Sequence, residues 1–317
     1  MRPECIVAKQ GNGAAAAAVE RRRKSVLVDG NNMLYHFYNP LCSLEVNGAK
    51  SGAMEGLVRL LKRMDQLHRP QHMCVFFDSP RQKTVRHHID PNYKRGRKPT
   101  PKSLRPQLQN AEALLERARV NAIVAPGFEA DDLIASYTEA LVARGDDVLV
   151  ISNDNDFLQL ARGGEQHPSV AMLTSDSDVT APTDDAAAER SEPMVELYQP
   201  NKRRYIRERQ LQGRFGLPRA SLLPDYYALC GSKWGKVPKV PHLDEEMAVA
   251  LLVQYGSLPK LLRQLNTIEN DVLRKTLKHS ISSIETSHRL SKLNADVPLP
   301  RPLEDLYTPP ELENLTI

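Results

Sequence analysis

Two patterns of apolar residues alternate along the first two-thirds of the chain, one typical of buried strands and the other typical of helices. Four short apolar runs have the length and β-branched content of buried strands, namely Ser25–Val28, His72–Phe77, Asn121–Ala125 and Asp147–Ile151. Between them, apolar side chains recur every three or four positions over 52–68, 103–117 (with Ser103 as N-cap) and 129–143, which predicts helices. Strand and helix therefore alternate, and we expect an α/β fold with a mainly parallel sheet and right-handed crossovers.

The pattern changes after residue 160. Residues 163–193 lack any period and predict a loosely ordered acidic insertion, whereas Met194–Tyr198 predicts one more strand at the sheet edge. Beyond residue 201 no buried strand is expected, and the helical stretches are Arg207–Phe215, Ala220–Leu229, Asp244–Tyr255, Leu258–Gln264 and Asn270–Leu293. We therefore divide the chain into an extension (1–24), an α/β domain (25–200), a smaller helical region (201–300) and a tail (301–317).

Composition narrows the class of protein. The chain has 317 residues, 41% of them hydrophobic and 26% charged, which is typical of a globular protein with a real core. Its apolar runs are too short for a membrane-spanning helix, so no membrane partner is expected. The four cysteines have no CxxC or Cys/His spacing, which argues against a zinc site or a disulfide scaffold and favours a reducing compartment.

The first 24 residues are rich in Ala and Arg and lack the apolar segment of a secretory signal. An organellar presequence is one interpretation and predicts a mitochondrial protein. Glu4 and Glu20 count against it, because such presequences avoid acids. A flexible tail on a nuclear or cytoplasmic protein is the alternative.

Charge is segregated along the chain although the net charge is only +4. Arg81–Arg105 holds nine Lys or Arg against one acid (+8), and Lys202–Arg214 holds six against one (+5). Residues 163–193 hold seven acids against one Arg (−6). Basic blocks on an acidic background favour a polyanionic partner such as nucleic acid, and solvated surface faces are the alternative interpretation.

Acidic residues follow each of the four predicted strands. They are Asp29, Asp78, Glu129 with Asp131 and Asp132, and Asp154 with Asp156. Because the carboxyl ends of parallel strands meet at one edge of a sheet, these side chains are expected to converge there. Their mutual repulsion calls for cations, and an all-oxygen donor set suits Mg²⁺ or Mn²⁺. One or two such ions commonly serve phosphoryl transfer.

Each acid also has a purely structural interpretation. Asp29 precedes a glycine and fits a turn, Asp131 and Asp132 fit the first turn of a helix, and Asp154 and Asp156 fit a helix cap. Their joint placement at four strand ends favours the metal site. Asp132 is the weakest candidate, because consecutive helical residues point apart.

Five motifs occur together in one order along the chain. They are KSVLVDGNNMLY (24–35), VFFD (75–78), YKRGRKPTPKSL (93–104), GFEADDLI (127–134) and ISNDNDFLQL (151–160), and LSKLNADVPL (290–299) follows. Together they resemble the 5′→3′ exonuclease and flap endonuclease family, especially the 5′-nuclease domain of bacterial DNA polymerase I. The resemblance covers about residues 24–300.

This resemblance implies a PIN-like fold, divalent cations, and hydrolysis of DNA near a 5′ end, flap or junction, with RNA also cut by some members. It places Asp29, Asp78, Glu129, Asp131, Asp154 and Asp156 on the family's metal-binding acids, with Asp132 beside them. It places Lys94 and Arg97 in the segment that arches over the active site, where a cation polarises the phosphate. Nucleic-acid contacts are further implied for Arg86, Arg95, Lys98 and Tyr93, the last of which either stacks on a base or packs internally.

The sequence departs from the family at a second acidic motif. Ser232 and Gly235 stand where the family has two acids, and the glycines of the following helix-turn-helix are replaced. A metal near Asp154 and Asp156 then has fewer ligands and binds more weakly. Positive charge on Lys233, Lys236 and Lys239 is expected to retain phosphate affinity without the close backbone approach that glycine allows.

Two hypotheses follow. The first is a metal-dependent 5′ nuclease in which Asp29, Asp78, Lys94 and Arg97 carry the reaction. The second is a catalytically weakened nuclease fold that binds nucleic acid within a repair or ribonucleoprotein assembly. The retained carboxylates favour the enzyme, and the lost motif favours the binding protein.

Overall fold

The computed structural model describes most of the chain. The described residues are 22–39, 45–46, 49–79, 84–96, 98–163, 192–231, 239–309 and 312. Most of the N-terminal extension and of the acidic insertion fall outside these ranges. Of the site and motif residues discussed above, Arg97, Ser232, Lys233, Gly235 and Lys236 also lie outside them.

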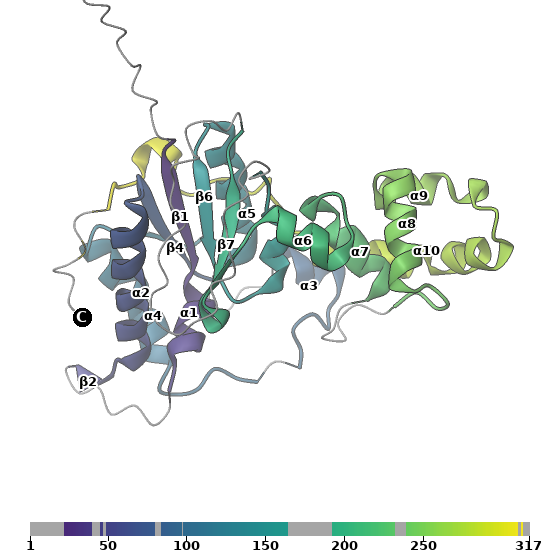
Figure 1. Cartoon of the computed structure of the whole chain (residues 1–317). Helices are drawn as coiled ribbons and strands as arrows, with labels where there is room; N and C mark the ends of the chain where they lie inside the picture. Colours follow the sequence, from purple (N-terminus) through teal and green to yellow (C-terminus); the bar gives the residue numbers. More distant parts are fainter. Residues whose placement is uncertain are drawn as a thin grey trace, which may run out of the picture.

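Six strands form the main sheet, in the order β5-β4-β1-β6-β7-β8 (Figure 1). They are β1 (Lys24–Asp29), β4 (His72–Phe76), β5 (Asn121–Ile123), β6 (Asp147–Ile151), β7 (Val195–Gln199) and β8 (Arg204–Ile206). All neighbours are parallel except β7 and β8, so the predicted mainly parallel sheet is confirmed. The edge strand is β8 and not β7 as expected, because three residues reading Arg-Tyr-Ile are too short and polar to register as an apolar run.

Helices cover both faces of the sheet (Figure 1). Val26 and Val28 of β1 pack with α1 (Gly30–Phe37), α2 (Gly52–His68) and α4 (Arg105–Arg117) in one apolar cluster. Leu27 points to the opposite face and packs in the cluster that contains α5 (Ala130–Ala143). Alternate residues of a strand face opposite sides, so a central strand between two helical layers must be apolar throughout.

Local capping explains where these helices begin. Asp29 caps α1, a short helix that the apolar period does not predict. The predicted bounds of α2 are confirmed, but Ser103 is not the N-cap of α4: Leu104 occupies that position. The Ser103 hydroxyl instead forms a hydrogen bond with the Tyr38 hydroxyl, at 2.8 Å between the oxygens. A two-stranded hairpin, β2 (Glu45–Val46) and β3 (Ala49–Lys50), precedes α2.

A smaller helical region follows the sheet, as predicted. Its helices are α6 (Glu208–Phe215), α7 (Leu223–Cys230), α8 (Glu245–Tyr255), α9 (Leu258–Arg263) and α10 (Asp271–Ser291). They extend to one side of the sheet (Figure 1). Apolar side chains of α7, α8 and α10 nevertheless belong to the same core cluster as those of α5, so one core runs through both parts. Among the helices in the described part of the chain, none combines the length and apolar character needed to cross a membrane.

The chain returns to the sheet after α10. The Asn294 amide donates to Asp132 Oδ1 at 2.9 Å, and the Tyr137 hydroxyl donates to the Arg301 carbonyl at 2.6 Å. Further along, the Tyr307 amide donates to Asn121 Oδ1 at 2.8 Å. Residues 301–307, assigned to a tail by the sequence, are thus hydrogen-bonded to α5 and β5.

Candidate active site

Four carboxylates gather at the carboxyl edge of the sheet. Asp29 ends β1, Asp78 lies two residues beyond β4, and Asp154 lies three residues beyond β6. Asp131 lies in the first turn of α5, which follows β5. The charges of Asp29, Asp78 and Asp154 all act on Asp131, so the four side chains occupy one region, as the sequence predicts.

Backbone and hydroxyl donors fix three of these carboxylates. Asp29 accepts from the Asn32 amide and from the Ser152 hydroxyl, both at 2.9 Å. Asp78 Oδ1 accepts from the Ala130 amide at 2.9 Å, where α5 begins. Asp154 Oδ1 accepts from the Asp156 amide at 3.0 Å and caps η1 (Asn155–Leu160), a 3-10 helix. The capping interpretation of Asp154 is therefore correct, and Asp29, interpreted from the sequence as a turn residue, is also a helix cap.

The crowding of negative charge is visible in the pKa values. Burial, together with the charges of Asp78 and Asp154, raises the pKa of Asp29 to about 7 although two hydrogen bonds oppose the shift. Burial and the charges of Asp29 and Asp78 raise the pKa of Asp131 well above its usual range. Carboxylates held together in this way are stabilised by a cation.

The donor chemistry of this edge fits a hard divalent cation. All four side chains offer carboxylate oxygens, and repulsion among them falls when a cation lies between them. Across the described residues, no group of three His, Cys, Asp or Glu side chains already has the arrangement of a metal site.

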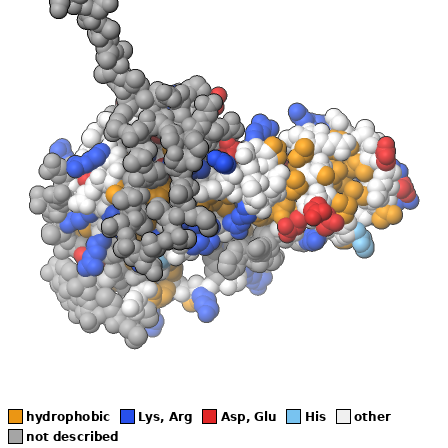
Figure 2. Space-filling model, viewed as in Figure 1, with side chains coloured by type: hydrophobic (Ala, Val, Ile, Leu, Met, Phe, Trp, Pro, Cys, Tyr) orange, Lys and Arg blue, Asp and Glu red, His pale blue; other side chains and the backbone are white. Residues whose placement is uncertain are grey.

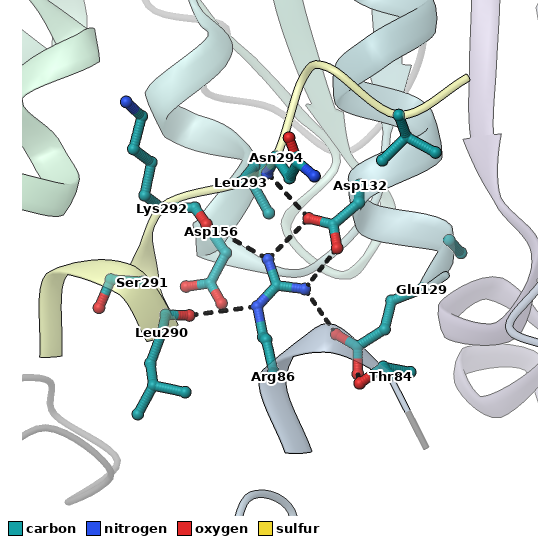
Figure 3. A network of polar contacts seen from close by, with 12 residues as sticks. Thr84, Arg86, Glu129, Asp132, Asp156, Leu290, Ser291, Lys292, Leu293 and Asn294 are labelled. Atoms are coloured by element: carbon teal, nitrogen blue, oxygen red, sulfur yellow. Dashed lines mark hydrogen bonds and ion pairs between the residues drawn. The ribbon is translucent and has the colours of Figure 1, made fainter. Parts of the chain in front are cut away.

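A buried arginine organises the neighbouring acids (Figure 3). Arg86 lies on α3 (Val85–Ile89) and is only 5% exposed. Its Nη1 donates to Glu129 Oε2 and to Asp132 Oδ2, and its Nη2 donates to Asp132 Oδ1, each at 2.8 Å. The same guanidinium donates to the carbonyls of Leu290 at 3.3 Å and Lys292 at 3.4 Å. Arg86 thus links α3, α5 and the end of α10.

These contacts differ from the ones that the sequence predicts for Arg86 and Asp132. The sequence places Arg86 against nucleic acid, but its guanidinium is enclosed by two carboxylates and two carbonyls. Asp132 is expected beside the metal acids, but both its oxygens accept from Arg86. Because Asp131 and Asp132 are consecutive on α5, they point apart, and only Asp131 faces the carboxylate edge.

Glu129 lies between the carboxylate edge and the basic segment. Lys94 Nζ donates to Glu129 Oε1 at 2.8 Å, and the Tyr93 hydroxyl donates to Oε2 at 3.3 Å. Lys94 also lies over the Tyr93 ring, 5.2 Å from its centroid, with a left-handed φ of 60°. Although burial opposes the shift, Lys94 and Arg86 lower the pKa of Glu129, so this carboxylate is ionised and paired with protein cations.

The remaining predicted residues lie at the surface where they are described. Asp156, Arg95, Lys98 and Lys239 are exposed. Arg95 donates to Asn92 Oδ1 at 2.9 Å, within the turn that carries Tyr93 and Lys94. The roles of these residues toward metal or nucleic acid stay predictions.

Sequence reasoning missed two polar residues that shape the site. Ser152 donates to Asp29 Oδ2, and its own hydroxyl accepts from the Asp154 amide at 3.1 Å, so it bridges two of the acids. The Asn32 side chain accepts from the Asn153 amide at 3.0 Å and joins α1 to the end of β6. Both follow a strand that ends in the site, and small polar residues at those positions were the available signal.

A mainly parallel sheet with clustered carboxylates at its carboxyl edge, a basic segment next to them and a helical region beyond is the arrangement of a resolvase-like, PIN-like fold. A family model described as 5′-3′ exonuclease, N-terminal resolvase-like domain, matches residues 24–191. A second, described as 5′-3′ exonuclease, C-terminal SAM fold, matches residues 219–313. The chain therefore belongs to the 5′-3′ exonuclease family, as the motifs predict.

Curated relatives cover most of the chain. DNA polymerase I of Bacillus caldotenax is 29% identical over 286 residues, covering 90% of this chain and 29% of that protein. The 5′-3′ exonuclease of Aquifex aeolicus is 28% identical over 281 residues, covering 88% of this chain and 85% of that protein. The chain thus spans less than a third of the length of the polymerase and most of the length of the exonuclease.

Solved structures support the fold. The T5 D15 protein co-crystallised with metal ions has a TM-score of 0.63 at 19% identity, covering 86% of this chain and 90% of that chain. The bacteriophage T5 D15 flap endonuclease in a pseudo-enzyme-product complex with DNA and metal ions has a TM-score of 0.62 at 18% identity. It covers 86% of this chain and 90% of that chain. At these identities the likeness concerns the fold alone.

Proposed function

We propose that this chain is a metal-dependent 5′ nuclease that hydrolyses phosphodiester bonds in DNA at a 5′ end or flap. The observation that carries the proposal is the convergence of Asp29, Asp78, Asp131 and Asp154 at one edge of the sheet, where burial and their mutual repulsion raise the pKa of Asp29 and Asp131. Membership in the 5′-3′ exonuclease family supports it. These four residues would hold one or two Mg²⁺ or Mn²⁺ ions, which supply Lewis-acid polarisation of the phosphate and activation of water.

The residues of the chain itself position the substrate. Lys94 lies at the edge of the carboxylate site, where its ammonium contacts Glu129. A phosphate oxygen that enters the site can replace Glu129 as the partner of this ammonium. Tyr93 shares the same carboxylate and offers a ring on which a terminal base can stack. The Ser152 hydroxyl fixes Asp29 and so maintains the orientation of one of the proposed metal ligands.

The basic segment that carries Lys94 and Arg97 supports nucleic acid as the substrate class. Nine Lys or Arg against one acid between residues 81 and 105 provide phosphate affinity that falls steeply with salt. DNA with a flap or a free 5′ end is the proposed substrate, and RNA is a second substrate to be tested. The Ala- and Arg-rich first 24 residues support a mitochondrial location, which N-terminal sequencing of the protein isolated from mitochondria tests.

A second candidate function is nucleic-acid binding with weak or no catalysis, in a repair or ribonucleoprotein assembly. It is favoured by Ser232 and Gly235, which stand where the family has acids. The change Ser232→Asp restores one carboxylate without affecting the glycine. If the enzyme hypothesis holds, this variant should cut faster than wild type at low Mg²⁺. If wild type and variant both bind a flap duplex and neither cuts it, the binding function is favoured.

A metal-dependent cleavage assay on a labelled 5′-flap duplex tests the proposal. Wild type should cut with Mg²⁺ or Mn²⁺ and not with EDTA, and Asp131→Asn and Asp154→Asn should each lower the rate at least 100-fold. Asp296→Asn, which removes an exposed acid far along the chain, is the matched control and should cut normally. Cleavage that survives Asp131→Asn and Asp154→Asn would refute this active site.

A further inference from the structure

A second basic element lies beside the carboxylate site, in the turn between β7 and β8. The turn begins with η3 (Pro200–Lys202), and its Asn201 amide donates to Asn153 Oδ1 at 2.9 Å. The Asn153 amide in turn donates to Asn32 Oδ1 at 3.0 Å, and the Asn32 amide donates to Asp29 Oδ1 at 2.9 Å. A short chain of hydrogen bonds therefore fixes this turn next to a site carboxylate. Figure 1 shows the turn near α1, at the end of the sheet where β1 ends.

Four cationic side chains project from this turn and from α6. Lys202, Arg203, Arg204 and Arg214 are all exposed, and we call them the turn cluster. Within the described stretches, none of the four forms an ion pair. Arg204 Nη2 contacts Gln199 Oε1 at 3.4 Å, and Arg214 lies 4.9 Å from the centroid of the Phe215 ring. Figure 2 shows Lys and Arg side chains over the region of α6, where the sheet meets the C-terminal helices.

Lys202, Arg204 and Arg214 of the turn cluster lie close enough to act on one another, and Arg214 shares a neighbour with the site acids. Partial desolvation and the nearby charges of Arg204 and Arg214 lower the pKa of Lys202. Burial and Asp156 raise the pKa of Tyr227, with Arg214 opposing and Asp154 adding to the shift. Tyr227 therefore lies within reach of both the site acids and Arg214. Like charges gathered on an exposed turn without ion-pair partners create a positive potential that attracts an anion.

The turn cluster and the turn that carries Tyr93 and Lys94 flank the carboxylates along the sheet. The latter turn follows β4, and Lys94 contacts Glu129 at the start of α5, beyond β5. The turn cluster follows β7, on the other side of β1 and β6 in the strand order. A polyanion that crosses the carboxylate edge therefore meets positive charge on both sides.

We propose that the turn cluster binds the phosphodiester backbone of a nucleic-acid strand beside the carboxylate site, on the side opposite Lys94. This inference rests on the proposed function and adds a second phosphate-binding surface to it. Three of its four members are arginines, whose planar guanidinium groups contact phosphate through paired hydrogen bonds. An acidic protein surface would also be attracted, but the continuity of the cluster with a site for phosphodiesters favours nucleic acid.

The test is equilibrium binding of the full chain to a labelled 5′-flap duplex in EDTA. Fluorescence anisotropy measures the binding at KCl concentrations from 50 to 300 mM. The variant is Lys202→Gln/Arg204→Gln/Arg214→Gln. Loss of three phosphate contacts should weaken binding at least tenfold at 100 mM KCl. It should also make the slope of log K against log [KCl] less steep by about 2 to 3, since each contact contributes about 0.9.

The matched control removes the same charge elsewhere. Arg59, Arg117 and Arg119 are exposed on α2 and at the end of α4, and Arg119 has a left-handed φ of 56°, for which Asn is the suited replacement. Arg59→Gln/Arg117→Gln/Arg119→Asn should change the slope by less than 1. Thermal unfolding of both triple variants checks that each remains folded. The single change Lys202→Glu provides a second measurement of how much the turn cluster contributes to binding of the duplex.

The outcomes separate this inference from the proposed function. If wild type and the control bind the duplex and the turn variant binds equally well with the same slope, the turn cluster is not a phosphate site, whereas the proposed function stands. If both triple variants lose affinity alike, the effect is one of net charge and the inference is overturned. If wild type itself does not bind any flap or single-stranded DNA, the proposed function fails first.

Discussion

The ammonium of Lys94 lies 2.8 Å from Oε1 of Glu129, so a cation expected to meet the substrate phosphate is held by a carboxylate expected to bind metal. While this pair is intact, Glu129 is engaged by protein cations and Lys94 is directed away from solvent. The arrival of a divalent cation and of a phosphate would separate the two, because each would then gain a stronger partner. Cation binding and substrate binding are therefore expected to be coupled through the ion pair of Lys94 with Glu129, while Arg86 stays paired with the other Glu129 oxygen.

This coupling predicts that Lys94→Met binds Mn²⁺ more tightly than wild type when no nucleic acid is present. Removal of the competing ammonium leaves Glu129 Oε1 with the Thr84 hydroxyl as its donor and no cation. A partly buried ion pair of about 1 kcal/mol corresponds to roughly a fivefold change in affinity. Titration of Mn²⁺ by electron paramagnetic resonance measures it. Lys98→Met removes an exposed lysine of the same segment and should leave the affinity unchanged. Equal Mn²⁺ affinity in all three proteins would contradict the coupling.

Arg86→Ala should destabilise the protein by about 3 to 5 kcal/mol, because Glu129 and Asp132 lose a buried partner. Urea unfolding measures this loss. Arg86→Met combined with Asp132→Leu removes both charges of the buried pair and should recover part of the stability. Arg59→Ala, which removes an exposed arginine paired with Glu55, should cost less than about 1 kcal/mol. A loss below 1 kcal/mol for Arg86→Ala would show that the network does not hold the fold together.

Divalent cations should stabilise the folded wild-type chain. They should stabilise it much less when one site carboxylate is replaced by a carboxamide. In EDTA, Asp131→Asn should raise Tm, because one of four repelling carboxylates is neutralised. With 5 mM Mg²⁺, wild type should gain Tm and the variant should gain little. Differential scanning fluorimetry measures both, with Asp296→Asn expected to match wild type in each condition. A variant less stable than wild type in EDTA would show that repulsion at this edge is small.

His72 should make stability depend on pH. Burial and the charge of Arg144 lower its pKa from 6.5, although the Tyr307 carbonyl and Asp146 oppose the shift. The unfolded chain therefore binds more protons than the folded one below about pH 6.5, and stability falls as the pH drops through this range. In His72→Asn, Tm should vary less between pH 5.5 and 7 than in wild type, while exposed His88→Asn should follow wild type. The same slope in His72→Asn would exclude this histidine as the cause.

The pattern of apolar residues was sufficient to predict the four central strands of the sheet. The runs that became β1, β4, β5 and β6 are apolar on both faces because helices cover both, and this makes them conspicuous. By contrast, α1 and α3 have eight and five residues, and such short segments carry too few turns to show a helical period. The edge strand β8 was missed for the related reason that two of its three residues are not buried.

The sequence was sufficient to predict where the site carboxylates lie, but it predicted the hydrogen-bond partners of the site residues only in part. Parallel topology alone places Asp29, Asp78, Asp131 and Asp154 together, since each follows a strand of one sheet. The role of Arg86 was not accessible in this way. Its acidic partners lie 43 and 46 residues away along the chain, and its carbonyl partners lie 204 and 206 residues away. Local sequence shows a basic residue in a basic segment and nothing of the carboxylates that enclose it.

The return of the chain after α10 bears on how the protein is made. Arg86 donates to the carbonyls of Leu290 and Lys292, and Asp132 accepts from the Asn294 amide. During synthesis the α/β sheet emerges from the ribosome long before these three residues, and domains generally fold in the order of emergence. The contacts of Arg86 with Glu129 and Asp132 can therefore form as soon as α5 has been synthesised. The carbonyls and the amide that enclose this buried network on its other side are added only after residue 294 has been synthesised.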